Sequence, residues 1–196
     1  HDGMIKRPSD GKIAKKIAWI QCMGSRNRRQ KRDYCSSICC MFALKEAVLA
    51  KEKGGPGVET TIFYMDMRTF GKGFQQYRDD AVEKHGVNLI RCRVQAVMRN
   101  PDGSLQIRYF DPESNEFFVK DYDLVVLSTG QIPYETHKKW ADLLSVQLDS
   151  RGLLAMEPAS KIKLAGKPGL FICGSLMGLT DVSEAMSSGI AAAGEA

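Results

Sequence analysis

The N-terminal half of the chain alternates short apolar runs with longer segments of helical periodicity. The run KIAWIQC has almost no polar break and predicts a buried strand, and the segment after it places apolar residues at helical spacing. The pattern then continues as strand, helix and strand. The predicted elements are strands at 16–22, 59–67 and 87–94 and helices at 36–54 and 74–85. Strands joined through single helices in this way pair in parallel, with right-handed crossovers.

The middle of the chain changes to short alternating strands separated by turn signals. The turns at 101–103 (PDG) and 112–115 (PESN) predict a small antiparallel meander. The meander leads into 122–135 (YDLVVLSTGQIPYE), whose apolar centre predicts a central strand that ends in a glycine turn. A polar helix is predicted at 136–147, and 169–196 predicts a strand, a glycine-containing turn and a helix rich in small residues. The whole pattern is that of an α/β protein with a Rossmann-like parallel sheet.

Length and composition are those of a globular chain. The 196 residues suffice for one domain, or for one domain and part of another. No apolar run reaches the roughly 18–20 residues that cross a bilayer, and the first twelve residues lack the apolar region of a secretory signal. We therefore expect a cytoplasmic or cytoplasm-facing protein without direct membrane insertion.

Four cysteines lie within the stretch 21–41, at Cys22, Cys35, Cys39 and Cys40. Adjacent cysteines such as Cys39 and Cys40 bridge each other only with strained geometry, and clustered thiols without an export signal indicate metal or redox chemistry. The end of the first strand and the start of the following helix are expected to bring the four together. Helix N-terminal amides and nearby cations favour thiolates there. An iron–sulfur cluster, a structural zinc site, a Cys35–Cys39 redox pair and incidental cysteines all remain open as interpretations.

The other two cysteines, Cys92 and Cys173, stand alone on strand-like segments, and we expect both to be small buried side chains. His85 and His137 lie in polar stretches and are expected to be exposed rather than ligands.

The net charge of +5 is concentrated in one place, because the rest of the chain is nearly balanced. The basic residues concerned are Arg26, Arg28, Arg29, Lys31 and Arg32. Such a run is a solvated surface or a surface that docks an acidic partner. Nucleic-acid binding is not expected, because no aromatic residues are interleaved and no binding motif is present.

Nicotinamide binding is not favoured by the turn after the first strand. That turn, QCMGSRN, contains only Gly24 in place of the glycine-rich fingerprint that lets the backbone approach a pyrophosphate. Asp66 ends the second strand where a ribose-binding acid would lie, but acids at strand ends are common. NAD(H) binding therefore stays an alternative.

Several segments resemble a known superfamily. DLVVLSTGQIP and the later GLFICGS…SEAMSSGIAAAGEA are similar to the flavin-dependent pyridine nucleotide–disulfide oxidoreductases of the thioredoxin reductase type. Within that superfamily, RPSDGK, IAWIQCMGSR, YCSSICCMFALKEA and FYMDMRTFGKGFQQY resemble the A subunit of heterodisulfide reductase and its relatives. These relatives include the A subunit of quinone-interacting membrane-bound oxidoreductase. The resemblance covers nearly the whole chain. The chain lacks the N-terminal flavin-binding GxGxxG unit and the CxxC ferredoxin modules of the family, so it resembles a fragment of a family member.

The resemblance implies an organisation and a function. Residues 1–135 would form a nicotinamide-domain-like central domain with the cysteine cluster, and 136–196 the C-terminal segment of an FAD-binding domain. The chain would be part of an oxidoreductase subunit in which electrons pass between FAD and a 4Fe–4S cluster to partner redox subunits or a ferredoxin. No residue is expected to be catalytic. The implied cluster ligands are Cys22, Cys35, Cys39 and Cys40. The implied flavin contacts are Thr129, Gly130, Gly174, Ser175, Asp181 and Val182, with Ser175 where the family has an aspartate. An NAD(P)H-dependent disulfide oxidoreductase and a zinc-stabilised interaction module are the alternatives.

Overall fold

The computed structural model describes residues 4–157, 160, 162–164 and 166–196. The chain folds into two compact units. One contains His1–Met23 and Cys39–Thr129, and the other contains Gly24–Ile38 and Gly130–Ala196. The cysteine-rich stretch is thus divided between the units, and each unit is described by itself below.

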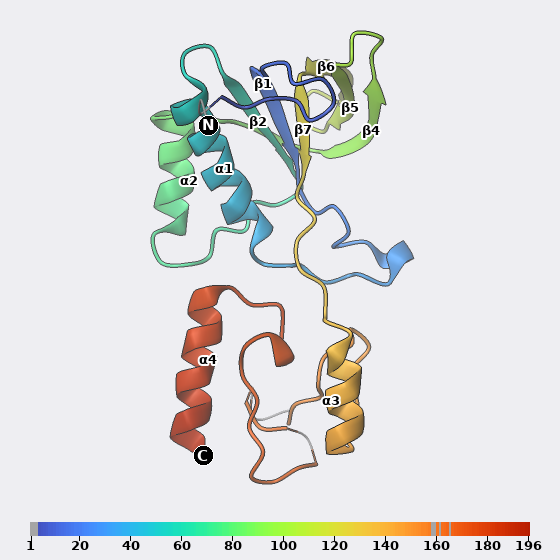
Figure 1. The fold of residues 1–196 in the computed structure, drawn as a ribbon, viewed down its shortest axis with the longest axis vertical. Coiled ribbons are helices and arrows are strands. Elements are labelled where there is room, and N and C mark those ends of the chain that lie inside the picture. The colour runs from blue at the N-terminus through green and yellow to red at the C-terminus, as the bar shows by residue number, and fades with distance from the viewer. Residues whose placement is uncertain (1–3, 158–159, 161, 165) are drawn as a thin grey trace. The chain divides into compact units, whose positions relative to one another are not determined.

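The first unit is built on a parallel four-stranded sheet in the order β3-β2-β1-β7. Its strands are β1 (Lys16–Ile20), β2 (Glu59–Tyr64), β3 (Asn88–Arg91) and β7 (Leu124–Leu127). The helices α1 (Cys39–Gly54) and α2 (Phe74–Glu83) lie on one face of this sheet (Figure 1). Residues 17–20 of β1 are all buried, because a central parallel strand is covered on both faces.

Alternate residues of β1 enter two different cores. Ile17 and Trp19 pack with Leu44 and Ile62 in the core beneath the helices. Ala18 and Ile20 point to the other face, into a second core with Phe63 and its neighbours. Because successive side chains of a strand point to opposite faces, β1 contributes to both cores.

The second core is closed by the antiparallel meander β4 (Arg93–Arg99), β5 (Leu105–Asp111) and β6 (Glu116–Tyr122). Tyr109 of β5 contacts Phe63 of β2 with ring centroids 5.0 Å apart. The parallel sheet and the meander confirm the predicted fold class. The turns between the meander strands fall at the predicted PDG and PESN segments.

The second unit contains η1 (Arg28–Gln30), α3 (Thr136–Leu144), η2 (Gly174–Leu176) and α4 (Val182–Glu195). Its core is made by Ala141, Leu154, Leu164 and Ile172. The strand predicted at the start of 169–196 is reduced to an isolated bridge between Lys163 and Phe171, because no continuous strand of the described residues pairs with it.

Four expectations about individual residues have clear outcomes. The first helix begins at Cys39 rather than at residue 36, because Ser37 has a left-handed φ of 62° that a right-handed helix does not accommodate. Cys92 is buried, as predicted. Cys173 is exposed, so its predicted burial is wrong; it lies in extended backbone just before η2, not inside a sheet. The predicted exposure of His137 is also wrong, since it is 4% exposed and belongs to the buried side of α3.

None of the helices in the described part of the chain combines the length and the apolar character needed to span a membrane.

Candidate functional site

The carboxyl ends of β1 and β7 are joined by side chains as well as by backbone. The Ser128 amide donates to Ile20 O and the Met23 amide donates to Ser128 O, over 3.0 and 3.2 Å. The side-chain amide of Gln21 donates to the Ser128 hydroxyl over 2.9 Å, and Gln21 is only 6% exposed. In open parallel sheets this edge, where the chain order reverses between neighbouring strands, is the usual ligand site. Here hydrogen bonds from Gln21 and Met23 to Ser128 join the ends of the two strands.

Cys22 lies in the middle of this tethered turn. It is half-buried, and its φ of 62° places a non-glycine residue in the left-handed region. Such a conformation is held by the surrounding bonds, which here are those of Gln21 and Met23 on either side. The backbone of Cys22 is therefore fixed in place.

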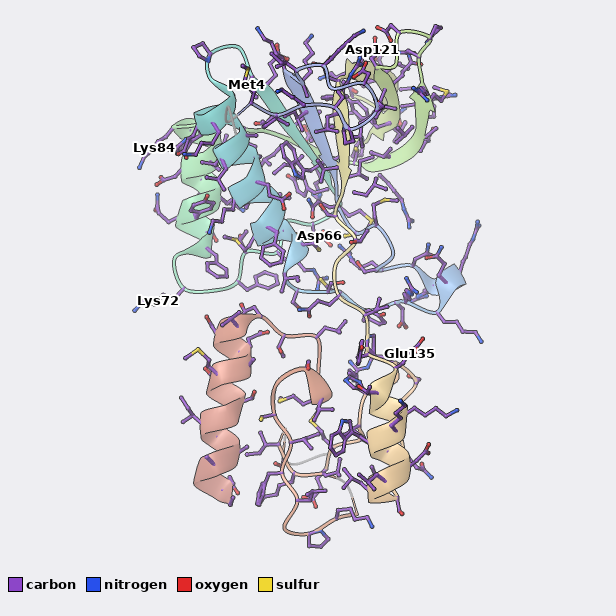
Figure 2. All side chains as sticks on the ribbon, viewed as in Figure 1. Met4, Asp66, Lys72, Lys84, Asp121 and Glu135 are labelled. Carbon is purple, nitrogen blue, oxygen red and sulfur yellow. The ribbon has the colours of Figure 1, made fainter. Side chains whose placement is uncertain are left out.

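Cys39 and Cys40 begin α1 and are 4% and 3% exposed. The Cys40 thiol contacts the carbonyl oxygen of Asp66 at 3.8 Å. Asp66, labelled in Figure 2, follows β2 at the edge of the sheet where α1 begins. The pKa of the Cys39 thiol is raised, first by its hydrogen bond with Cys40, then by burial and by the charge of Cys40. Hydrogen bonds with backbone groups of Cys39 and Cys22 act in the opposite direction.

The thiols of two predicted ligands, Cys39 and Cys40, thus meet in the first unit, and the backbone of a third, Cys22, lies beside them. Cys39 has the Cys40 thiol on one side and the Cys22 backbone on another, at the N-terminus of a helix. Two neighbouring buried thiols do not both ionise without a compensating positive charge, which a metal ion or cluster provides. The donor chemistry therefore fits a thiolate-bound inorganic centre.

The fourth predicted ligand, Cys35, belongs to the second unit. Its half-buried sulfur accepts a hydrogen bond from the Ser37 amide over 3.4 Å. It lines a cavity of about 360 Å³ within that unit. Other residues around this cavity are Tyr34, Ser37, Pro133, Arg151 and Gly178. In the part of the chain that the structure describes, no three His, Cys, Asp or Glu side chains form a group that could hold a metal ion. Ligation by all four cysteines stays a prediction.

The predicted flavin contacts fall mostly in the second unit. Gly130, Gly174, Ser175, Asp181 and Val182 belong to it, whereas Thr129 is the last residue of the first unit. The side-chain amide of Gln131 donates to Thr180 O over 3.3 Å, which links the segments that carry Gly130 and Asp181.

The N-terminus of α4 is closed by a reciprocal capping box. Asp181 Oδ1 accepts from the Glu184 amide over 2.7 Å, and the Asp181 amide donates to Glu184 Oε2 over 3.1 Å. Gly174, at a φ of 61°, donates its amide to the Ser188 hydroxyl over 3.0 Å. The carboxylate of Asp181 therefore caps the helix, and Ser188 hydrogen-bonds the turn at Gly174 to the same helix.

The candidate ribose-binding acid, Asp66, has an exposed carboxylate. Its carboxylate lies 3.9 Å from the guanidinium of Arg91, and both side chains are substantially exposed. An exposed pair of this kind contributes little energy and imposes little geometry.

Sequence reasoning missed three polar residues that organise these segments. Gln21 is adjacent to Cys22 and ends an apolar run, which is the signal that could have found it. Ser188 is a buried polar residue on a helix of small residues and gave no such signal. His137 is buried, and its Nδ1 lies 3.2 Å from Gly152 O.

The chain is similar along its length to curated proteins from methanogens. It is 36% identical over 197 residues to the A subunit of the H(2):CoB-CoM heterodisulfide,ferredoxin reductase of Methanothermobacter thermautotrophicus, covering 100% of this chain and 30% of that protein. It is 38% identical over 189 residues to the iron-sulfur A subunit of the CoB--CoM heterodisulfide reductase of Methanocaldococcus jannaschii, covering 95% and 29%. The chain thus spans about 30% of the length of these relatives. No family model matches it.

Solved structures with a similar fold are thioredoxin reductases. The enzyme of Lactococcus lactis has a TM-score of 0.58 and 18% identity, over 99% of this chain and 54% of that one. The enzyme of T. acidophilum has a TM-score of 0.56 and 17% identity, over 90% and 50%. These likenesses establish the fold.

Proposed function

This chain is homologous over its whole length to one segment of the heterodisulfide reductase A subunit, and we propose that it passes electrons between FAD and a 4Fe–4S cluster. Its homologues are oxidoreductase subunits. In this proposal the chain is the part of a flavin- and iron–sulfur-containing subunit that joins the two carriers. Partner redox subunits or a ferredoxin exchange electrons with it.

The observation that carries the proposal is the buried Cys39–Cys40 pair beside the backbone of Cys22. The pair lies at a helix N-terminus and at the carboxyl edge of the parallel sheet. Four thiolates are the usual ligands of iron–sulfur clusters, and Cys35 is the proposed fourth. An iron–sulfur cluster supplies one-electron transfer when bound, and a flavin supplies two-electron and one-electron chemistry.

The protein's own groups have definite tasks in this proposal. The Gln21–Ser128 bond and the backbone bonds around it hold Cys22 in its left-handed conformation. The first-turn amides of α1 favour negative charge on Cys39 and Cys40. Residues of this kind tune a cluster by hydrogen bonding and by excluding water.

On the flavin side, the proposed contacts are Thr129, Gly130, Gly174, Ser175, Asp181 and Val182. The positive end of the α4 helix dipole at this terminus is suited to an electron-rich ring edge. Ser175 is exposed and offers a hydroxyl where the family has a carboxylate, so its bond to a ribityl chain would be uncharged. Because Asp181 caps α4, its contribution is to hold the helix terminus in place.

The proposal places the protein in a reducing cytoplasm, where thiolate ligands are not lost to disulfides. It assigns no catalytic residue to the chain, because substrate chemistry would take place on other subunits.

The test is anaerobic reduction of the full-length protein with dithionite, followed by electron paramagnetic resonance. We expect a reduced-cluster signal that disappears in Cys22→Ser and persists in Cys173→Ser, because Cys173 is exposed and is not a proposed ligand. A colourless protein with stoichiometric zinc would favour the interaction module. NADH oxidation that survives Cys22→Ser would favour the NAD(P)H-dependent disulfide oxidoreductase.

A further inference from the structure

Residues 26–32, which we call the basic loop, form a loop of the second unit that is closed by backbone hydrogen bonds (Figure 1). Asn27 and Arg32 form an antiparallel bridge in which each backbone amide donates to the other's carbonyl, over 2.6 and 3.0 Å. The Asn27 side chain accepts from the Arg29 amide over 3.1 Å and caps η1. Lys31, at a φ of 55°, closes the turn with a bond to Arg28 O. The loop therefore presents its side chains from a defined backbone.

The exposed cations of this loop have no carboxylate partner within the described residues. Arg28, Arg29 and Lys31 are exposed. None of the three takes part in an ion pair with another described residue. The acid in the adjoining sequence, Asp33, is exposed and likewise has no ion-pair partner among the described residues.

The base of the loop lies next to the cavity that Cys35 lines in the same unit. The Arg26 amide donates to Tyr34 O over 2.9 Å, and Tyr34 lines the same cavity of about 360 Å³ as Cys35. A protein bound to the loop would therefore lie beside a cavity that contains a predicted cluster ligand.

We propose that the basic loop is the docking surface for an acidic electron-transfer protein, which it holds next to the Cys35 cavity. This inference rests on the proposed electron-transfer function and adds the surface and the charge of the partner. Unpaired cations on a rigid loop steer an acidic protein and set its orientation, and such rim charges act mainly on the association rate and its salt dependence. An acidic protein is favoured over a nucleic acid, because no exposed aromatic side chain alternates with the cations to stack on bases.

The test is binding of a small acidic ferredoxin, used as a probe, to the anaerobically purified full-length protein at about 50 mM salt, where charges are weakly screened. The variant is Arg28→Glu/Arg29→Glu. The matched control is Lys138→Glu/Lys139→Glu, an exposed adjacent pair of cations in the same unit that changes the net charge equally. We expect binding about tenfold weaker in the loop variant and less than about twofold weaker in the control.

Equal weakening in both variants, or none in either, would overturn the proposal, because a specific surface would then be absent. Tighter binding of an RNA 20-mer than of the ferredoxin, lost in the loop variant, would replace it with a nucleic-acid surface. Iron and sulfide are measured on the same samples. If the protein contains the cluster but binding does not depend on the loop, only the docking surface is refuted. If binding depends on the loop but the protein contains no cluster, the electron-transfer function is refuted and the docking surface is kept.

Discussion

The side-chain amide of Gln21 donates a hydrogen bond to the hydroxyl of Ser128 over 2.9 Å, across the carboxyl ends of β1 and β7. Gln21 directly precedes Cys22, and Ser128 is also bonded through its backbone to Ile20 and Met23. The bond therefore fastens the turn that carries a proposed cluster ligand to the neighbouring strand. These hydrogen bonds lie at the edge where a parallel sheet usually holds a ligand.

Removing the hydroxyl should loosen this turn. Ser128→Ala leaves the buried Gln21 amide without its acceptor, and we expect a loss of about 1–2 kcal/mol in the free energy of unfolding. The measurement is urea denaturation of the native protein and the variant. Ser187→Ala, an exposed serine on α4, should change stability by less than about 0.5 kcal/mol. Equal stability of Ser128→Ala and the native protein would mean that water replaces the bond and that the turn is not held by it.

The cap of α4 gives a second prediction. Asp181→Ala removes the acceptor for the Glu184 amide, which should cost about 1 kcal/mol of stability in the second unit. Hydrogen exchange of the first α4 amides should accelerate, whereas exchange in α3 should not change. Asp181→Asn keeps a capping oxygen and should retain most of the stability. If Asp181→Ala leaves α4 exchange unchanged, the capping box does not hold this terminus.

Cysteine accessibility separates bound from free thiols. In chelator-treated protein, iodoacetamide should label Cys173, which is exposed, and the half-buried Cys35, but not the buried Cys92. Loading with iron and sulfide should protect Cys35 and leave Cys173 labelled, because a cluster ligand is no longer a free nucleophile. Mass spectrometry of the alkylated peptides reads out both states. Equal labelling of Cys35 in both would remove it from the ligand set.

A pH-dependent contribution is expected from the N-terminal segment. Arg7 is 6% exposed, donates from Nε to Asp10 Oδ1 over 3.0 Å and forms a second bond to the same carboxylate. The hydrogen bond from Arg7 lowers the pKa of Asp10. The unfolded chain therefore binds a proton at higher pH than the folded one, and the stabilisation is present above the usual aspartate pKa of about 4 and is lost as the pH falls through the folded value.

Asp10→Asn should therefore lower the urea midpoint at pH 7, and the difference from the native protein should shrink below about pH 4. Asp142→Asn, which changes an exposed aspartate on α3, should show no difference at either pH. If the difference in urea midpoint between the native protein and Asp10→Asn does not change with pH, the bond to Arg7 does not depend on the charge of Asp10.

The first unit follows closely from the sequence, because its patterns are local. The four residues 17–20 are apolar without a break, as a strand covered on both faces requires, and PDG and PESN mark the meander turns unambiguously. The predicted start of α1 is too early because the left-handed φ of Ser37 depends on its surroundings and not on residue type.

The second unit is less predictable, because its packing joins segments far apart in sequence. Residues 24–38 associate with residues 130–196, as in the bond from the Ser36 hydroxyl to Gln131 O, and no local pattern indicates this. The buried His137 likewise contacts the distant Gly152, at 3.2 Å from Nδ1 to the carbonyl oxygen. The predicted division of the chain at residue 135 and the assigned flavin and cluster residues stay predictions.

The most direct measurement is the iron and acid-labile sulfide content of the full-length protein purified anaerobically, compared with Cys22→Ser, Cys39→Ser and Cys173→Ser. The account predicts about four iron and four sulfide attributable to this site. Both should be lost in Cys22→Ser and in Cys39→Ser and retained in Cys173→Ser. Iron and sulfide unchanged by the first two substitutions, or one zinc in their place, would contradict it.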